Sequence, residues 1–453
     1  MRPVKTLKKE LAKRPVVFIA RDLERALGLS LIKYNYYIIT NKTSFSQKTE
    51  VRSQKNIITI KNDCLLDTHE LLANPHTTKL LKKNSPRIVV FKSTSMIEKI
   101  CEEHGSELLN PPSKLSNTIE EKISQVEWLG ELKKLLPPHR IEILKNLNWD
   151  NLNSPQPPLN GGRGGVTSSP SLQERARGSY ILQFNRAHTG SGTILIESES
   201  QLKELREKFP DRPVRVTEFI DGPMFTNNNV VWGKKILCGN INYQITGLTP
   251  FTDRPFATIG NDWGLPHKLL SKKLQQEYYK IAQAVGKKLV RDGWKGLFGI
   301  DVVLDRKKKK LYLIEINARQ PASTTYESQL QESQKSKIKS QKFVTTFEAH
   351  LASLLGLKYG GEELIKIQDG AQIIQRVTKN IKYQILNIKK SIKKLENLKC
   401  NVITYDNHEE GADLMRIQSR KSIMNGHDQF NTSGEKIKQT LFRKQLNRHS
   451  FIT

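Results

Sequence analysis

Acidic, amide and guanidinium side chains alternate along one otherwise apolar part of the chain. Asp301 lies in the run GLFGIDVVLD, and Glu315, Asn317 and Arg319 occupy every second position at the end of LYLIEINAR. Alternate residues of a β-strand point to the same face of a sheet. Carboxylate and amide oxygens are the ligands that Mg²⁺ prefers in proteins. The spacing therefore predicts a metal site formed by the two acids and Asn317, with the cation of Arg319 beside it.

Two strands joined by a hairpin must position these side chains. The basic run DRKKKK separates the two apolar runs and is expected to be the hairpin tip. The alternative is an ordinary surface strand with alternating polar residues. The apolar sequence LYLIEI favours the metal site, because an unpaired acid on a half-buried strand is costly.

The first part of the chain alternates short apolar runs with helical patterns. Strands are expected at residues 16–20, 36–40, 57–60 and 87–91, and a helical pattern precedes the last of them. This alternation is typical of an open, doubly wound parallel sheet. We therefore expect residues 1–115 to form a small α/β domain, closed by the turn at Asn110, Pro111 and Pro112.

The middle of the chain predicts a helix, an insertion and an antiparallel sheet. Residues 116–136 have apolar side chains at helical spacing and end at two prolines. Residues 154–178 are rich in Pro, Gly and Ser and are expected to be a flexible insertion. Their GGRGG lacks the Lys and Ser or Thr of a phosphate-binding P-loop. Short β-rich runs follow residue 180, and a helix is expected at about 273–291.

These features resemble the ATP-grasp superfamily, and its carboxylate-amine ligases in particular. The family's Glu-x-Asn-x-Arg strand appears as Glu315, Asn317 and Arg319, and FGIDVV resembles the strand that carries the first acidic metal ligand. The resemblance implies a multidomain α/β and α+β protein. In it, an amino-terminal open parallel sheet domain precedes an ATP-grasp fold of two α+β subdomains at residues 116–355. Residues 356–453 are expected to be a peripheral carboxy-terminal region.

The resemblance also implies an ATP site and a cofactor pair of ATP with Mg²⁺ or Mn²⁺. The hinge VTEFIDG would contact adenine, and the loop AHTGSGT would place its backbone amides near the phosphates. By resemblance the ATP-binding residues are Lys122, Gln183, Gly190, Ser191, Gly192, Glu218, Phe219 and Ile220.

Two positions depart from the family pattern. Gln183 stands where a second phosphate-binding lysine is usual, so charge at the α-phosphate would come from Arg186 or from a lysine that the sequence does not reveal. No acid follows the hinge to hold the ribose. The asparagines at positions 227–229 either take that role or form a turn.

The resemblance implies that a carboxylate is activated as an acyl-phosphate and then joined to an amine, or to a thiol. Arg319 would be the catalytic cation, neutralising the acyl-phosphate or binding a substrate carboxylate. The segments at 260–263 (GNDW) and 319–327 (RQPASTTYE) are expected to contact substrate, unless they are simple loops. His188 and His350 are expected to face solvent or to be structural. The alternative function is an inactive ATP-grasp protein that binds nucleotide or nucleic acid.

Composition limits the other partners. The 453 residues carry a net charge of +29, which attracts polyanions in general. Nucleic acid is an unlikely partner because only 7% of residues are aromatic and they do not interleave with basic ones. No run approaches the roughly 20 apolar residues of a membrane span. We expect a cytoplasmic protein with reduced cysteines that acts on small-molecule carboxylates and amines, with a homodimer as one option.

Overall fold

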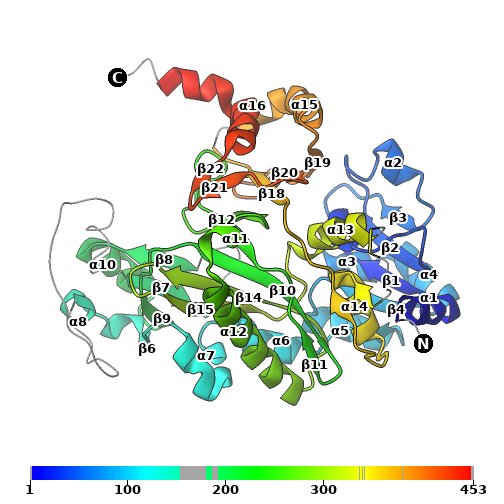
Figure 1. Cartoon of the computed structure of the whole chain (residues 1–453), viewed down its shortest axis with the longest axis horizontal. Helices are drawn as coiled ribbons and strands as arrows, with labels where there is room; N and C mark the ends of the chain where they lie inside the picture. The colour runs from blue at the N-terminus through cyan, green and yellow to red at the C-terminus, as the bar shows by residue number, and fades with distance from the viewer. Residues whose placement is uncertain are drawn as a thin grey trace.

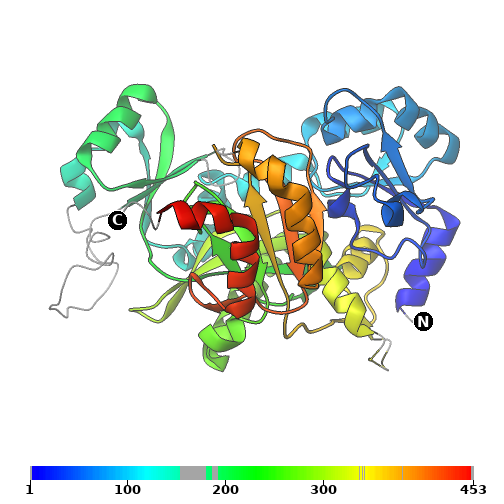
Figure 2. The same ribbon diagram turned by 90° about the horizontal axis from the view of Figure 1, so that it is seen from above.

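The computed structural model describes residues 3–153, 180–185 and 192–449, except positions 336, 339, 341 and 380. Figure 1 shows an N-terminal unit in blue at one side, a large central sheet, and a smaller sheet unit at the opposite side. The turned view in Figure 2 shows the C-terminal helices, in orange and red, lying between the two outer units.

The N-terminal unit is built on a five-stranded sheet whose described strands are all parallel, in the order β3-β2-β1-β4-β5. Its strands are β1 (Val16–Ile19), β2 (Tyr36–Asn41), β3 (Ile57–Ile60), β4 (Arg87–Val90) and β5 (Glu107–Leu108). Its helices are α1 (Pro3–Lys13), η1 (Leu23–Ala26), α2 (Thr49–Arg52), α3 (Thr68–Ala73), α4 (Pro75–Asn84) and α5 (Ser95–Glu103). The expected open parallel sheet is confirmed, and β5 is an additional strand too short to show a sequence pattern.

The core of this unit is completed by a helix from much later in the chain, α14 (Thr346–Leu354). The Phe347 ring lies 6.1 Å from the rings of both Phe18 and Tyr36. A Cβ atom on Gly28 would lie 2.3 Å from Phe347, so only glycine allows this approach. The N-terminal sheet therefore depends on a segment outside residues 1–115 for its packing.

The smaller unit is a four-stranded antiparallel sheet in the order β6-β9-β7-β8. Its elements are β6 (His139–Ile143), η3 (Leu144–Asn146), α8 (Trp149–Asn153), β7 (Tyr180–Phe184), β8 (Thr193–Ile196), α10 (Glu199–Lys208) and β9 (Pro213–Glu218). The insertion expected at 154–178 lies outside the described residues.

The central sheet has nine strands, in the order β15-β14-β10-β12-β13-β18-β20-β19, with β11 paired to β10. These strands are β10 (Met224–Trp232), β11 (Lys235–Leu237), β12 (Asn242–Thr246), β13 (Thr258–Asp262), β14 (Gly296–Asp305), β15 (Lys310–Asn317), β18 (Ala371–Arg376), β19 (Asn401–Thr404) and β20 (Asp413–Ser419). Residues 356–453, expected to be peripheral, thus supply three strands of this sheet. The exact domain boundaries stay a prediction, but the C-terminal region is part of the central sheet.

Helices cover both faces of the central sheet. The apolar face packs against α12 (Lys272–Arg291), α15 (Ile381–Asn397) and α16 (Thr432–His449) in one large hydrophobic cluster. On the other face, α13 (Thr324–Lys335) is hydrogen-bonded to β10 through Asn228 and Glu327. The remaining elements are α11 (Pro266–Leu269), β16 (Phe343–Val344), β17 (Glu363–Leu364), β21 (Met424–Gly426) and β22 (Gln429–Phe430).

The helix expected at 116–136 is broken into α6 (Ser113–Glu120), α7 (Ser124–Leu129) and η2 (Gly130–Leu135). At the first break, the backbone N–H groups of Lys122 and Ile123 donate to the main-chain and side-chain oxygens of Asn185. At the second, Gly130 adopts φ 56°. The expectation of one helix was wrong because Asn185, at the end of β7, competes for the helical N–H groups.

The three asparagines of β10 neither form a turn nor face solvent. Asn227, Asn228 and Asn229 are fully buried within the strand. The side chains of Asn227 and Asn229 hydrogen-bond to each other at 2.7 and 2.8 Å. Both interpretations made from the sequence, a ribose contact and a turn, were therefore wrong. Among the described residues, no helix is long and apolar enough to cross a membrane.

Candidate functional site

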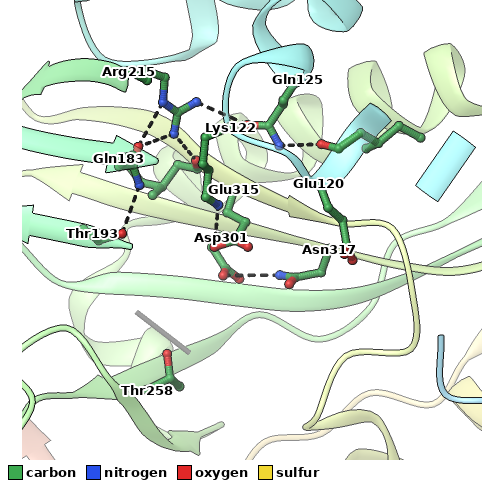
Figure 3. Close-up of polar contacts among 12 residues, drawn as sticks. Glu120, Lys122, Gln125, Gln183, Thr193, Arg215, Thr258, Asp301, Glu315 and Asn317 are labelled. Atoms are coloured by element: carbon green, nitrogen blue, oxygen red, sulfur yellow. Dashed lines mark hydrogen bonds and ion pairs between the residues drawn. The ribbon is translucent and has the colours of Figure 1, made fainter. Parts of the chain in front are cut away.

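The acids expected to bind metal face each other on neighbouring strands. In the hairpin of β14 and β15, Asp301 lies opposite Glu315, with a register shift directly after Asp301. The Asn317 amide donates to Asp301 Oδ2 at 3.3 Å, and Thr226 on β10 lies opposite Asp301 on its other side. Figure 3 shows these groups gathered over the sheet. The hairpin brings together the three residues of the metal prediction.

The like charges of Asp301 and Glu315 lie close together here. Burial and the neighbouring Glu315 carboxylate raise the pKa of Asp301 to about 6. Burial also acts to raise the pKa of Glu315, but the charge of Lys122 outweighs it and the pKa of Glu315 is lowered. The buried Asp301 carboxylate, the partly exposed Glu315 carboxylate and the amide of Asn317 fit a divalent cation, which would relieve this repulsion. Among the described residues, here or elsewhere, no group of three or more His, Cys, Asp or Glu residues could hold a metal ion, and this site has two such acids.

Lys122 reaches the acids from the break between α6 and α7. Its Nζ lies 3.0 Å from Glu315 Oε2, and the side chain is largely buried. The broken helix is therefore what positions this lysine, because a continuous helix would not bond to Asn185. Figure 3 shows Lys122 next to the acid pair.

Arg215 is a cation at the candidate site that the sequence analysis missed. It lies opposite Gln183 in the pairing of β7 with β9, and its Nε and Nη2 donate to Gln183 Oε1 at 2.9 and 2.5 Å (Figure 3). Burial lowers its pKa to about 10, and the charge of Glu315 partly offsets this effect. Arg215 thus supplies a cation beside the glutamine that replaces the family lysine. The signal in the sequence was an arginine between the two buried valines, Val214 and Val216, of a short strand.

Arg319 lies at the carboxyl end of β15, between the metal acids and the N-terminal unit. Its Nη2 donates to Asn317 Oδ1 at 2.9 Å, and its Nε lies 3.2 Å from Glu120 Oε1. Its guanidinium also stacks over the ring of Phe91, the residue directly after β4, at 5.4 Å from the ring centroid. Lys92 forms an ion pair with the same Glu120. Arg319 is therefore held at the junction of the two units, at the carboxyl ends of their strands.

The expected hinge residues connect the two ATP-grasp sheets. Glu218 ends β9, and Phe219 and Ile220 lead toward β10 in the central sheet. The Phe219 ring contacts Phe256 edge to face, with centroids 6.4 Å apart. A Cβ atom on Gly222 would lie 1.9 Å from the Leu304 carbonyl oxygen. The hinge therefore passes so close to β14 that only glycine fits.

The glycine loop is only partly described. Gly190 and Ser191, like Arg186 and His188, lie outside the described residues. Gly192 accepts a hydrogen bond from the Phe184 N–H at 3.0 Å, and Gln183 pairs with Thr193. Gly192 therefore lies where β7 and β8 pair, next to Gln183. The predicted ATP-binding residues come from three elements, the α6–α7 break, the β7–β8 pair and the hinge.

The two segments expected to contact substrate lie against each other. Trp263, after β13, packs edge to face on Tyr326 of α13 with ring centroids 5.9 Å apart. Asp262 is buried on the opposite face of the sheet and accepts hydrogen bonds from backbone groups. His350 is buried, not solvent-facing, and accepts a hydrogen bond from the Leu297 N–H.

Comparison with known proteins agrees with this architecture. A family model described as the ATP-grasp domain matches residues 145–323. A search of curated protein sequences found no match. Among solved structures, the chain is similar to N5-carboxyaminoimidazole synthase from Aspergillus clavatus, crystallised with ADP and 5-aminoimidazole ribonucleotide. The two are 12% identical, with a TM-score of 0.60, over 95% of this chain and 98% of that one.

Two further structures extend this likeness. L-amino acid ligase from Bacillus licheniformis is 11% identical with a TM-score of 0.56, over 94% of this chain and 96% of that one. Phosphoribosylamine-glycine ligase from Thermotoga maritima is 10% identical with a TM-score of 0.55, over 94% and 95%. At these identities the likeness shows the fold. Residues 145–323 therefore match the ATP-grasp domain, and the two sheets with their hinge agree with that match.

Proposed function

We propose that this protein is an ATP-dependent ligase that joins a carboxylate to an amine. The observation that carries the proposal is the pair of neighbouring acids, Asp301 and Glu315, placed among the cations Lys122, Arg215 and Arg319 in an ATP-grasp domain. Two of the similar structures are an L-amino acid ligase and a phosphoribosylamine-glycine ligase, which supports this reaction class.

The proposed reaction has two steps. A carboxylate oxygen attacks the γ-phosphorus of ATP, and ADP leaves with the bridging oxygen. The amine nitrogen then attacks the acyl carbon, inorganic phosphate leaves, and the nitrogen loses a proton. Because charge moves between phosphate oxygens in both steps, the protein contributes chiefly positioning and charge neutralisation.

Each charged group has a role in this scheme. Asp301, Glu315 and Asn317 would hold Mg²⁺, which when bound neutralises charge on the β- and γ-phosphates. Lys122, whose Nζ lies 3.0 Å from Glu315 Oε2, would supply a positive charge to the phosphates. Gln183 and the β7–β8 loop amides donate hydrogen bonds, while Arg215 supplies the charge that the glutamine lacks. Glu218, Phe219 and Ile220 contact adenine.

Arg319 is the proposed catalytic cation. It lies next to Asn317 and at the edge of the N-terminal sheet, where substrates bind in open α/β folds. From that position its guanidinium can bind the carboxylate substrate in two parallel hydrogen bonds and then stabilise the acyl-phosphate.

Release of ADP and phosphate from Mg²⁺-ATP, measured with amino acids and small carboxylates in turn, tests the proposal. Substrate-dependent release is expected, and Glu315→Gln should lower it by at least about 100-fold, the scale of losing one preorganised electrostatic group. Glu410→Gln, at an exposed position, is the matched control. ATP binding with no release under any substrate would instead support the inactive, nucleotide-binding alternative.

A further inference from the structure

A cavity of about 480 Å³ lies next to the hinge, among segments from three parts of the chain. Its lining residues come from the hairpin of β21 and β22, from α11 and the start of α12, and from the tip of the β14–β15 hairpin (Figure 1). Pro223, which follows the hinge directly, also lines it. Small-molecule sites usually have volumes of roughly 300–1,000 Å³. The cavity is therefore large enough for a small organic ligand.

This cavity is on the other face of the central sheet from the proposed metal site. Leu304 lines it and belongs to the apolar cluster of the sheet, together with Ile300 and Val302 of the same strand. Strand β14 pairs with β10 without a register shift over these positions. Successive residues of a strand point to opposite faces, so Asp301 points away from the face that carries the cavity. A ligand bound here would not contact the metal acids.

Part of the cavity lining is apolar and fixed in position. Leu269 at the end of α11, Leu274 in the first turn of α12 and Leu304 supply aliphatic surface, and the first two are only half-buried. The His427 ring also lines the cavity, and its Nδ1 lies 2.9 Å from the Tyr243 hydroxyl, with the two rings edge to face. Apolar surface left in contact with water in a concave site favours a ligand with an apolar body.

Two cations line the same cavity, and neither forms an ion pair with a described residue. They are Arg306 and Lys309, at the exposed tip of the β14–β15 hairpin. The neighbouring Asp305 accepts from two backbone N–H groups of the tip and pairs with a lysine three residues on, at 3.9 Å. Burial lowers the pKa of His427; the charge of Asp428 opposes this shift, and the charge of Arg306, close to the ring, adds to it. None of the described lining residues is acidic, so the cavity carries unbalanced positive charge.

We propose that this cavity is a second ligand site, which binds a small organic anion with an apolar body. The carboxylate head of such a ligand lies at Arg306 and Lys309, and its alkyl or aryl body packs against the leucines. The proposal does not rest on the ligase function, because the cavity shares no lining residue with the metal acids or with the predicted ATP-binding residues.

The combination of apolar surface and positive charge selects this class of ligand. An inorganic anion would leave the three leucines in contact with water. A fully apolar molecule would cover two cations without supplying a counter-charge, which is costly. A carboxylate accepts charge-assisted hydrogen bonds from both a guanidinium and an ammonium group, and an attached alkyl or aryl group covers the leucines.

Calorimetric titration of the full-length protein with phenylbutyrate and with phenylbutanol tests this site. The two probes share the ring and the carbon chain and differ in the carboxylate or hydroxyl end. The wild-type protein should bind phenylbutyrate at least about 10-fold more tightly than phenylbutanol, and also than acetate, which lacks the apolar body. The double variant Arg306→Gln with Lys309→Gln should abolish the preference over phenylbutanol. Lys307→Gln with Lys310→Gln removes the same charge from the same hairpin outside the cavity lining and should keep it.

This measurement needs neither ATP nor turnover, so its result is separate from the test of ligase activity. All four substituted residues are exposed, and an unchanged midpoint of thermal unfolding shows that the variants are folded. Equal affinities for phenylbutyrate and phenylbutanol would overturn the proposal. So would an equal loss of affinity in the two double variants, binding of acetate as tight as that of phenylbutyrate, or no binding of either phenyl probe at millimolar concentration.

Discussion

Arg215 donates two hydrogen bonds to Gln183 on the neighbouring strand. In the proposed function, the guanidinium of Arg215 supplies the positive charge that binds the α-phosphate. If Arg215 supplies the charge, Arg215→Gln should weaken ATP binding by about 10- to 100-fold, the loss expected for one charge-assisted hydrogen bond. The double variant Gln183→Lys with Arg215→Gln should recover most of the lost affinity for ATP. Equilibrium titration with ATP measures both.

The matched control for this pair is Lys203→Gln on the exposed side of α10, which removes one charge at a distance. If Arg215→Gln binds ATP as well as this control does, the charge must come from another group. Arg186, outside the described residues, would then be the next to test.

His350 makes stability depend on pH. Its ring is wholly buried, and this burial lowers its pKa to about 3. An unfolded histidine titrates near pH 6.5, so between these values the unfolded state binds more protons. The contribution of the neutral His350 ring to the free energy of unfolding is complete above pH 6.5 and is lost as the pH falls toward 3.

Urea unfolding at pH 7.5 and 5.0 isolates this effect. His350→Asn keeps an acceptor for the Leu297 N–H but does not titrate. Between the two pH values the wild-type protein should lose about 2 kcal/mol more of its free energy of unfolding than the variant. Parallel losses in the two proteins would show that His350 is not responsible.

At the scale of elements, Asp262 fastens the C-terminal hairpin of β21 and β22 to β13. Its Oδ2 accepts from the Ile423 and Met424 N–H groups at 2.8 and 3.0 Å, and its Oδ1 accepts from Gly264 and Leu265. Asp262→Asn would turn an N–H₂ group toward backbone donors. The free energy of unfolding should fall by about 2 kcal/mol or more.

Urea titration against Asp253→Asn, an exposed aspartate on the loop before β13, provides the comparison. A loss no larger than that of Asp253→Asn would mean that the five bonds to Asp262 are replaced by water at little cost.

Elements whose residues satisfy a local pattern could be predicted from the sequence. The hairpin carrying Asp301 and Glu315 follows from apolar alternation, and the first four parallel strands follow from their apolar runs. The break that positions Lys122 could not be predicted, because it depends on Asn185, more than sixty residues away. The same holds for Arg215, whose role appears only once the register with Gln183 is known.

At the scale of the whole molecule, the N-terminal unit and the C-terminal strands meet through a buried polar cluster. The Tyr405 hydroxyl donates to Glu24 Oε1 at 2.7 Å and accepts from Arg416 Nε at 2.9 Å. Tyr405→Phe would remove both hydrogen bonds, although Glu24 keeps its contact with Arg25 and Arg416 keeps its contact with Asp413. The free energy of unfolding should fall by about 1–3 kcal/mol. No pattern in the sequence predicts this contact, since Glu24 and Tyr405 lie in segments that were assigned to separate regions.

Chemical denaturation followed by tryptophan fluorescence measures this loss, with Tyr37→Phe on β2 as the matched change. If the two variants unfold alike, the cluster holds the units in register without adding stability.

The helix α14 has a consequence for how the protein is made. Its Phe347 fills the core between Phe18 and Tyr36, so the first sheet lacks part of its interior until more than three hundred residues have been synthesised. For about half a minute of translation, at roughly 5–20 residues per second, the nascent N-terminal strands remain incompletely packed on the ribosome. The nascent chain is therefore a natural client for chaperones that shield exposed apolar strands.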